Sequence, residues 1–142
     1  MNTIEQALSI LQESGYRVTA PRRALVEIID EQDRAFTADE LLRLLAGRGE
    51  AVGRATVFRT LDVLVNSGVL DRLHRPDGCH TYVRTERDSE HRHHLICSDC
   101  GAVVQFDECT VAPLLEELGQ RTNFAISGHW LEVFGLCATC RH

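Results

Sequence analysis

A chain of 142 residues fits one ordinary domain or two small ones, and a hydrophobic content of 44% is sufficient for a buried core. No apolar run approaches the roughly 18 residues that cross a bilayer, and the polar start of the chain is not typical of a secretion signal. Six cysteines without such a signal favour metal or redox chemistry over a disulfide framework, so we expect a cytoplasmic protein.

The net charge of −6 is concentrated in the second part of the chain. Residues 1–85 carry 11 Arg against 12 acidic residues, whereas residues 86–142 carry 4 Arg against 9. All 15 basic residues are Arg, which suits bidentate contacts to phosphate and guanine, although genomic base composition explains the same bias equally well. The charge therefore does not exclude nucleic acid as a partner of the first part.

Helix-capping signals and apolar spacing predict three helices before residue 50. The first begins with a capping box at Thr3 and ends before Gly15. The second follows Thr19 and has Pro21 in its first turn, and the third follows Thr37.

A fourth helix and a hairpin then indicate a winged helix. "RATVFRTLDVLVNSG" separates apolar from polar positions, and "VLDRLHRPDGCHTYVR" alternates around a turn at Pro76-Asp77-Gly78. In a winged helix, the helix before the hairpin enters the major groove, where exposed arginines pair with guanine. An ordinary helical domain with a charged, solvated face is the alternative.

Two C-x-x-C pairs dominate the second half, and their cysteines are Cys97, Cys100, Cys137 and Cys140. Two such pairs can close a tetrahedral zinc site of four thiolates, with redox-switching thiols as the alternative. Between them we predict a hairpin through "HLICS" and "AVVQF", a helix in "TVAPLLEELGQRT" and two strands in "FAISGHWLEVFGLC". The result is an α+β module whose stability depends on zinc.

The stretch "HRHHLICSDCG" adds histidines that a four-cysteine site does not use. Alternate residues of a strand share a face, so His91 and His93 are predicted to point together while His94 points away. Two imidazoles on one face suit zinc, iron, nickel or copper, so we expect a second metal site. A solvated His-rich loop between modules is the alternative.

These motifs together resemble the ferric uptake regulator family. "YRVTAPRRALVEII", "TADELL", "RATVFRTLDVLVNSGVL", "HRHHLICSDCGAVVQF" and "HWLEVFGLCATC" occur in the order and spacing of that family and cover nearly the whole chain. The resemblance implies a homodimeric, metal-dependent transcription factor that binds a palindromic DNA operator. It implies a winged-helix DNA-binding domain over residues 1–85, a dimerisation domain over 86–142 and a hinge at about 84–92, with structural zinc held by the four cysteines.

The resemblance also assigns residues to DNA binding. Arg59 falls at the base-contacting arginine of the family, and Phe58 stands where a tyrosine is usual. Arg17 and Arg22 match basic positions near the DNA backbone or minor groove. The expected DNA-binding residues are Arg17, Arg22, Arg54, Thr56, Phe58 and Arg59.

The sensing metal is predicted to be zinc. Ala35 replaces a histidine of iron-type members, and Arg92 interrupts the histidine run. Asp71 and His94 fall on ligand positions of zinc-type members, but Thr85 replaces their cysteine, so soft ligands elsewhere are expected to substitute. The predicted regulatory ligands are Asp71, Cys79, His80, His94 and Cys109.

A third, interdomain metal site is implied by the same resemblance. Its histidines match His91, His93 and His129, while its usual acid falls at Ala112, so Glu108 or Asp107 is expected to replace it.

The expected function is repression of zinc-uptake genes by the zinc-loaded dimer, with an iron-responsive or peroxide-sensing regulator of the same family as the alternative. Catalysis is not expected, because no motif of a metallohydrolase, zinc deaminase, nucleophile elbow or phosphate-binding loop occurs.

Overall fold

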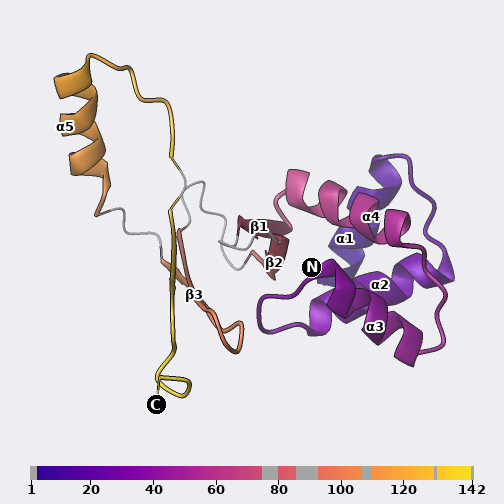
Figure 1. Cartoon of the computed structure of the whole chain (residues 1–142). Coiled ribbons are helices and arrows are strands. Elements are labelled where there is room, and N and C mark those ends of the chain that lie inside the picture. Colours follow the sequence, from indigo (N-terminus) through magenta and orange to yellow (C-terminus); the bar gives the residue numbers. More distant parts are fainter. Residues whose placement is uncertain (1–2, 75–79, 86–92, 107–109, 130, 142) are drawn as a thin grey trace. The chain divides into compact units, whose positions relative to one another are not determined.

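The computed structural model describes residues 3–74, 80–85, 93–106, 110–129 and 131–141, and the predicted α+β class is confirmed (Figure 1). The chain divides into two compact units, Met1–Arg87 and Asp88–His142. Within the described ranges, no helix has the length and apolar character needed to span a membrane.

Four helices build the first unit: α1 (Thr3–Glu13), α2 (Ala20–Glu31), α3 (Ala38–Gly47) and α4 (Arg54–Asn66). The predicted caps of α2 and α3 are confirmed. The hydroxyl of Thr19 accepts from the backbone N–H of Arg22, and that of Thr37 from Glu40. The apolar faces of all four helices meet in one core, whose fully buried members include Leu11, Leu25, Ile28, Leu41, Leu45, Leu61 and Leu64.

The predicted hairpin follows α4, and its two strands are confirmed, while the predicted turn at Pro76-Asp77-Gly78 lies outside the described residues. Strands β1 (Leu70–His74) and β2 (His80–Arg84) pair antiparallel, from Leu70 opposite Arg84 to His74 opposite His80. Phe36, in the loop before α3, exchanges two backbone hydrogen bonds with Tyr82, and the two rings stack with centres 6.1 Å apart. The hairpin is thereby attached to the helical core, as a wing is in a winged helix.

The second unit is a small three-stranded sheet with one helix. Its elements are β3 (His93–Cys97), β4 (Val103–Phe106), α5 (Ala112–Thr122) and β5 (Glu132–Gly135). β3 is central, with β4 antiparallel on one edge and β5 parallel on the other. After residue 92, the buried residues among those described are His93, His94, Ile96, Cys97 and Gly119. This unit therefore has very little hydrophobic core of its own.

The prediction of two strands in "FAISGHWLEVFGLC" was wrong in its first half. β5 supplies one strand, but residues 124–129 form none. A strand needs a neighbour that shares its backbone hydrogen bonds, whereas the backbone hydrogen bond described for this segment joins Phe124 to Gly119 of α5 and not to the sheet.

Gly119 allows the chain to fold back against α5. Asn123 adopts a left-handed conformation with φ 57°, and the N–H of Phe124 then donates to the carbonyl of Gly119 at 2.9 Å. A Cβ on Gly119 would lie 2.9 Å from the carbonyl oxygen of Phe124 and 3.4 Å from a side-chain carbon of Ile126. No side chain therefore fits at this position without movement of the backbone.

We expect Gly119→Ala to lower the free energy of unfolding by about 1–3 kcal/mol, because the added methyl group collides with backbone. Gly47, the last residue of α3, is the control, since a Cβ there meets nothing within 4 Å. Gly47→Ala should be neutral or stabilising by up to about 1 kcal/mol. Urea unfolding followed by circular dichroism measures both, and equal effects of the two substitutions would contradict the steric argument.

Candidate metal centre

Parallel pairing of β3 with β5 brings the two C-x-x-C pairs together. Parallel strands run in the same direction, so their carboxyl ends lie at the same end of the sheet. Cys97 is the last residue of β3 and pairs with Gly135, the last residue of β5. The N–H of Ser98 then donates to the carbonyl of Gly135 at 2.8 Å, and Cys137 follows two residues later. Each pair thus occupies the tight turn directly after its strand.

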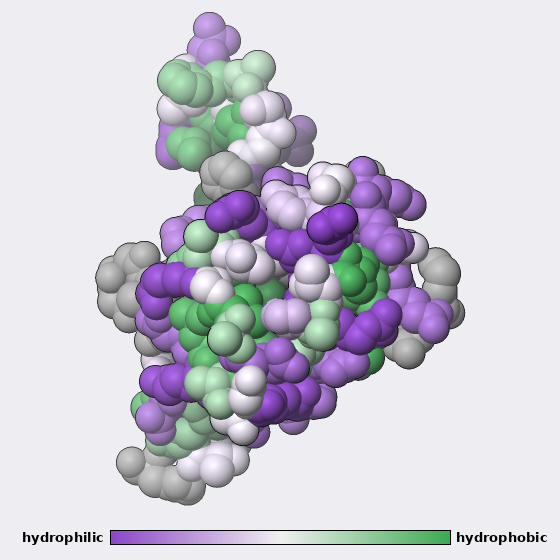
Figure 2. Space-filling model, turned by 90° about the vertical axis from the view of Figure 1, so that its right-hand side faces the viewer, coloured by the Kyte–Doolittle hydropathy of each residue, from purple (hydrophilic) through white to green (hydrophobic). Residues whose placement is uncertain are grey.

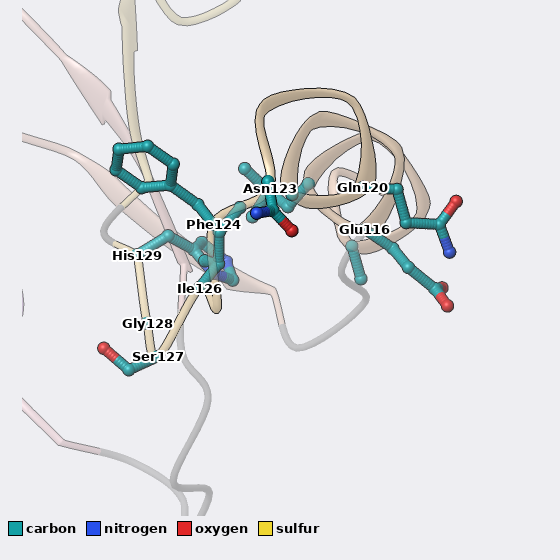
Figure 3. A pocket seen from close by; sticks show the side chains of 11 residues that line it. Glu116, Gln120, Asn123, Phe124, Ile126, Ser127, Gly128 and His129 are labelled. Carbon is teal, nitrogen blue, oxygen red and sulfur yellow. The ribbon is translucent and has the colours of Figure 1, made fainter.

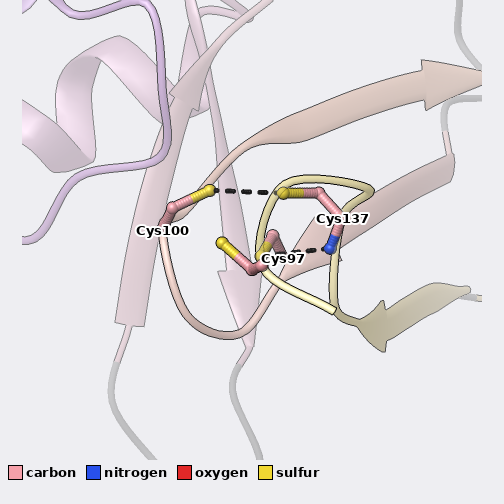
Figure 4. A group of neighbouring side chains, drawn as sticks. Cys97, Cys100 and Cys137 are labelled. Carbon is pink, nitrogen blue, oxygen red and sulfur yellow. Dashed lines mark hydrogen bonds between the residues drawn. The ribbon is translucent and has the colours of Figure 1, made fainter. Parts of the chain in front are cut away.

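The four cysteines form a cluster with the dimensions of a zinc site, and Figure 4 labels three of them, Cys97, Cys100 and Cys137. The Sγ atoms of Cys97, Cys100, Cys137 and Cys140 all lie within 4.8 Å of one another. Thiolates at about 2.3 Å from one tetrahedral ion are about 3.8 Å apart. Cys100 Sγ and Cys137 Sγ are separated by 3.8 Å, far longer than a disulfide bond. The cluster can therefore hold a metal ion as four thiolates.

Backbone N–H groups favour the thiolate form in this cluster. Those of Cys100 and Cys137 are foremost in lowering the pKa of the Cys97 thiol to about 6. The N–H of Cys137 donates to Cys97 Sγ at 3.4 Å. A hydrogen bond with the Cys137 thiol raises the pKa of Cys140. Cys97 therefore readily presents a thiolate to a cation, whereas the Cys140 thiol holds its proton more tightly.

A pair of imidazoles lies in the same unit. The rings of His93 and His129 have centres 5.3 Å apart, and His93 also contacts Phe106, its partner across β3 and β4. His93 is only 1% exposed. The structure thus brings together two histidines that were predicted to share the additional metal site.

His129 also lines an open pocket of about 890 Å³ between α5 and residues 124–129 (Figure 3). Ala112, at the position of the family's usual acid, and Glu116, one helical turn later, line the same pocket. Figure 3 shows the Glu116 side chain directed away from His129. Glu116 was not among the predicted site residues, and its spacing of four residues from Ala112 places both on the same face of α5.

The predicted regulatory ligands are distributed over different faces and units. His94 is buried in β3 of the second unit. Asp71 pairs with Val83 in the wing, whereas His80 pairs with His74. Cross-strand partners share a face and neighbours alternate, so Asp71 and His80 lie on opposite faces of the hairpin. Cys79, His91, Glu108 and Cys109 lie outside the described residues.

Helix α4 presents an exposed polar face in the first unit. Phe58 is 36% exposed, and Arg54 and Arg59 are also exposed. The Arg54 guanidinium lies 5.6 Å from the Phe58 ring centre and forms an ion pair with Asp39 at 2.6 Å. Among the described residues, no carboxylate pairs with Arg59. Thr56 is half-buried on the same helix.

The other two predicted DNA-binding arginines lie close together before and within α2. The Arg22 guanidinium lies 5.0 Å from the Tyr16 ring centre and donates to the carbonyl of Arg17 at 2.7 Å. The Arg17 side chain is exposed. The backbone of Arg17 and the side chain of Arg22 are thereby fixed relative to each other.

Comparison with known proteins identifies the family to which this fold and this cysteine cluster belong. Residues 13–134 match the profile of the Ferric uptake regulator family. The chain belongs to this family. It is 34% identical over 132 residues to the zinc uptake regulation protein of Mycobacterium tuberculosis, covering 92% of this chain and 99% of that one. It is 32% identical over 130 residues to the ferric uptake regulation protein of Vibrio anguillarum, covering 90% and 85%.

A solved structure of a zinc uptake regulator complexed with zinc and DNA has the same fold. It superposes with a TM-score of 0.69 at 28% identity, covering 98% of this chain and 95% of that chain. The family consists of metal-responsive transcription regulators and not of enzymes. The chain is therefore a metal-responsive regulator with an N-terminal winged-helix DNA-binding domain and a C-terminal dimerisation domain.

We expect Cys97→Ser to lose the zinc ion and unfold the second unit, because three thiolates no longer close the site and this unit has little core of its own. The helices of the first unit should persist. Metal content by mass spectrometry and two-dimensional NMR measure the two effects. Thr139→Ala, an exposed non-ligand in the second turn, is the control and should retain one zinc per chain. Stoichiometric zinc in a natively folded Cys97→Ser protein would contradict the assignment.

Proposed function

We propose that the chain is a homodimeric repressor that senses zinc and, when zinc-loaded, binds a palindromic operator to repress genes for zinc uptake. The observation that carries this proposal is the His93–His129 pair, with ring centres 5.3 Å apart in the same unit as the four-cysteine cluster. A metal-responsive regulator needs an exchangeable metal ion in addition to a structural one. Two imidazoles form a weaker site than four thiolates, so the pair, which belongs to the proposed additional site, supports an exchangeable metal in this chain.

The ligand chemistry supports zinc over iron. Relatives named for zinc and for iron are about equally similar to this chain, so their names do not decide the metal. Nitrogen ligands bind zinc more tightly than iron(II). Ala35 replaces a histidine of iron-type members, and Cys79 and Cys109 offer thiolates for the proposed regulatory site. Soft sulfur together with imidazole favours zinc over iron.

The ligands proposed for the regulatory site come from both units, and this part rests on the sequence resemblance. Asp71 belongs to the first unit and His94 to the second, with Cys79 and Cys109 as additional thiolates. His80 is left out, because it lies on the face of the wing opposite Asp71. For the additional site we propose His91 and Glu108 beside His93 and His129.

Metal that is held by ligands of both units would fix the angle between the DNA-binding domains of a dimer. Only a dimer whose recognition helices match the half-site spacing binds its operator well. Shifting the ratio of DNA-binding to non-binding dimers from 1:99 to 99:1 requires the metal to bind the DNA-binding form more tightly by about 5.5 kcal/mol. Zinc sites supply energies on the order of 10 kcal/mol, which is sufficient.

The exposed apolar surface of the second unit supports the homodimer. Leu114 is 62% exposed, Leu118 37%, Phe124 73% and Ile126 42%. In Figure 2 the lobe at the top, which contains α5, shows hydrophobic surface in green. Leu114 and Leu118 are one helical turn apart and form a stripe on α5. Such a patch on a unit with little core is best covered by a second copy.

To test the sensed metal, the protein is stripped of its weaker metal but keeps its four-cysteine zinc. It is then titrated with zinc or iron(II) while binding to a palindromic operator is followed by fluorescence anisotropy. We expect zinc to switch on binding at a lower free concentration than iron(II). His93→Ala should remain a folded dimer but bind DNA poorly at the same zinc level. Activation by iron(II) alone would make the chain an iron-responsive regulator.

Two arginine variants control this titration. Arg59→Ala should weaken operator binding by about 1–3 kcal/mol, because an arginine that reads guanine is lost. Arg43, which is exposed on α3, is the matched control, since Arg43→Ala removes the same charge from another helix. Equal losses in both variants would indicate general electrostatics in place of base contacts by α4.

We expect Leu118→Lys to dissociate the dimer, because a charge placed on the α5 stripe cannot be buried against a second copy. Glu117→Lys makes the matched control, since it adds a lysine at the neighbouring, exposed position of the same helix. Analytical ultracentrifugation of the zinc-loaded proteins measures the effect. A Leu118→Lys protein that is as dimeric as Glu117→Lys would place the interface elsewhere.

A further inference from the structure

Two histidines oppose each other at the end of the wing. His74 is the last residue of β1, His80 is the first of β2, and the two form a directly opposed pair in the antiparallel register. Both side chains are exposed, and their ring centres are 5.3 Å apart with an angle of 70° between the planes. We propose that His74 and His80 form a binding site for a divalent transition metal of the zinc, nickel and copper class, separate from the four-cysteine centre and from the His93–His129 pair.

The separation of the rings fits one shared ion. A zinc–nitrogen bond is about 2.1 Å, and the centre of an imidazole lies about 1.1 Å behind its coordinating nitrogen. Two rings at a tetrahedral angle around one ion therefore have centres about 5 Å apart. Cross-strand pairing brings the two side chains together, so binding requires little more than rotation of these side chains.

The charges on this face of the hairpin do not oppose a cation. Cross-strand partners share a face, so Arg72 and Arg84 lie on the same side as the two histidines. Arg72 is engaged by the Asp62 carboxylate and lies 5.7 Å from the Tyr82 ring centre. Arg84 forms an ion pair with Asp30 at 3.4 Å. Both positive charges are thereby compensated before an ion arrives.

The chemistry of the site follows from its two ligands. Neutral imidazole nitrogens favour zinc, copper and nickel over magnesium or calcium, which prefer oxygen. Two protein ligands leave positions open to water, so this site is weaker than the four-cysteine site and fills after it. Leu70 anchors one end of the hairpin in the core. A bound ion would join β1 to β2 at the other end, where His74 pairs with His80. The consequence is a more rigid wing.

The test uses the full chain with zinc in its four-cysteine site and Zn²⁺ as the probe. NMR signals of the histidine Cε1–H groups are followed as zinc is added. We expect the signals of His74 and His80 to shift together. His74→Gln and His80→Gln should each weaken this binding by about 10- to 100-fold, because the second imidazole then no longer binds intramolecularly. Circular dichroism verifies the fold of each variant.

Thr81→Val is the matched control, because Thr81 lies next to His80 on β2 but on the opposite face of the hairpin, and valine has nearly the same shape. It should leave the zinc-dependent shifts of both histidines unchanged. The proposal is overturned if the two signals do not move up to millimolar zinc. It is also overturned if His80→Gln loses the binding while His74→Gln keeps it, since His80 then serves a different site. Neither readout uses DNA, so failure here is separate from failure of the proposed function.

Discussion

The parallel pairing of β3 with β5 is the constraint on which the second unit depends. It places two turns at the same end of the sheet and brings four Sγ atoms within 4.8 Å of one another. Folded proteins are stable by only about 5–15 kcal/mol, and structural zinc contributes on the order of 10 kcal/mol. A unit with five buried residues among those described cannot obtain this stability from hydrophobic burial alone. Metal binding and contact with a second copy of the chain must therefore supply the remaining stability of this unit.

The first unit, in contrast, is stabilised by its hydrophobic core and not by metal. Four helices and the wing share one apolar core, in which Leu11, Leu25, Leu61 and Leu64 are fully buried and Tyr82 nearly so. This core contains no group that requires a metal. The DNA-binding unit can therefore remain folded whatever the metal supply, while the second unit responds to it. This separation is what a metal-dependent regulator requires, because its recognition helix stays intact as its dimer geometry changes.

Local features of the fold could be predicted from the sequence, whereas features set by distant pairing could not. Thr19 and Thr37 cap their helices as predicted, because a cap is decided by residues three apart. Residues 124–129 resemble a strand by composition, but whether they pair with a sheet depends on contacts with residues distant in the sequence. The pairing of His74 with His80 likewise depends on the register of the wing.

Strand register also decides which candidate ligands can act together. On β3, His93 and Cys97 share a face, while His94 lies on the other, so the two neighbouring histidines cannot easily bind the same ion. His93 and Cys97 are four residues apart, or about 13 Å along the strand. The four-cysteine cluster lies at one end of this strand and the His93–His129 pair at the other. A change in the cysteine cluster would therefore be transmitted along β3 to His93, so a metal site at the histidine pair would depend on the integrity of the cluster.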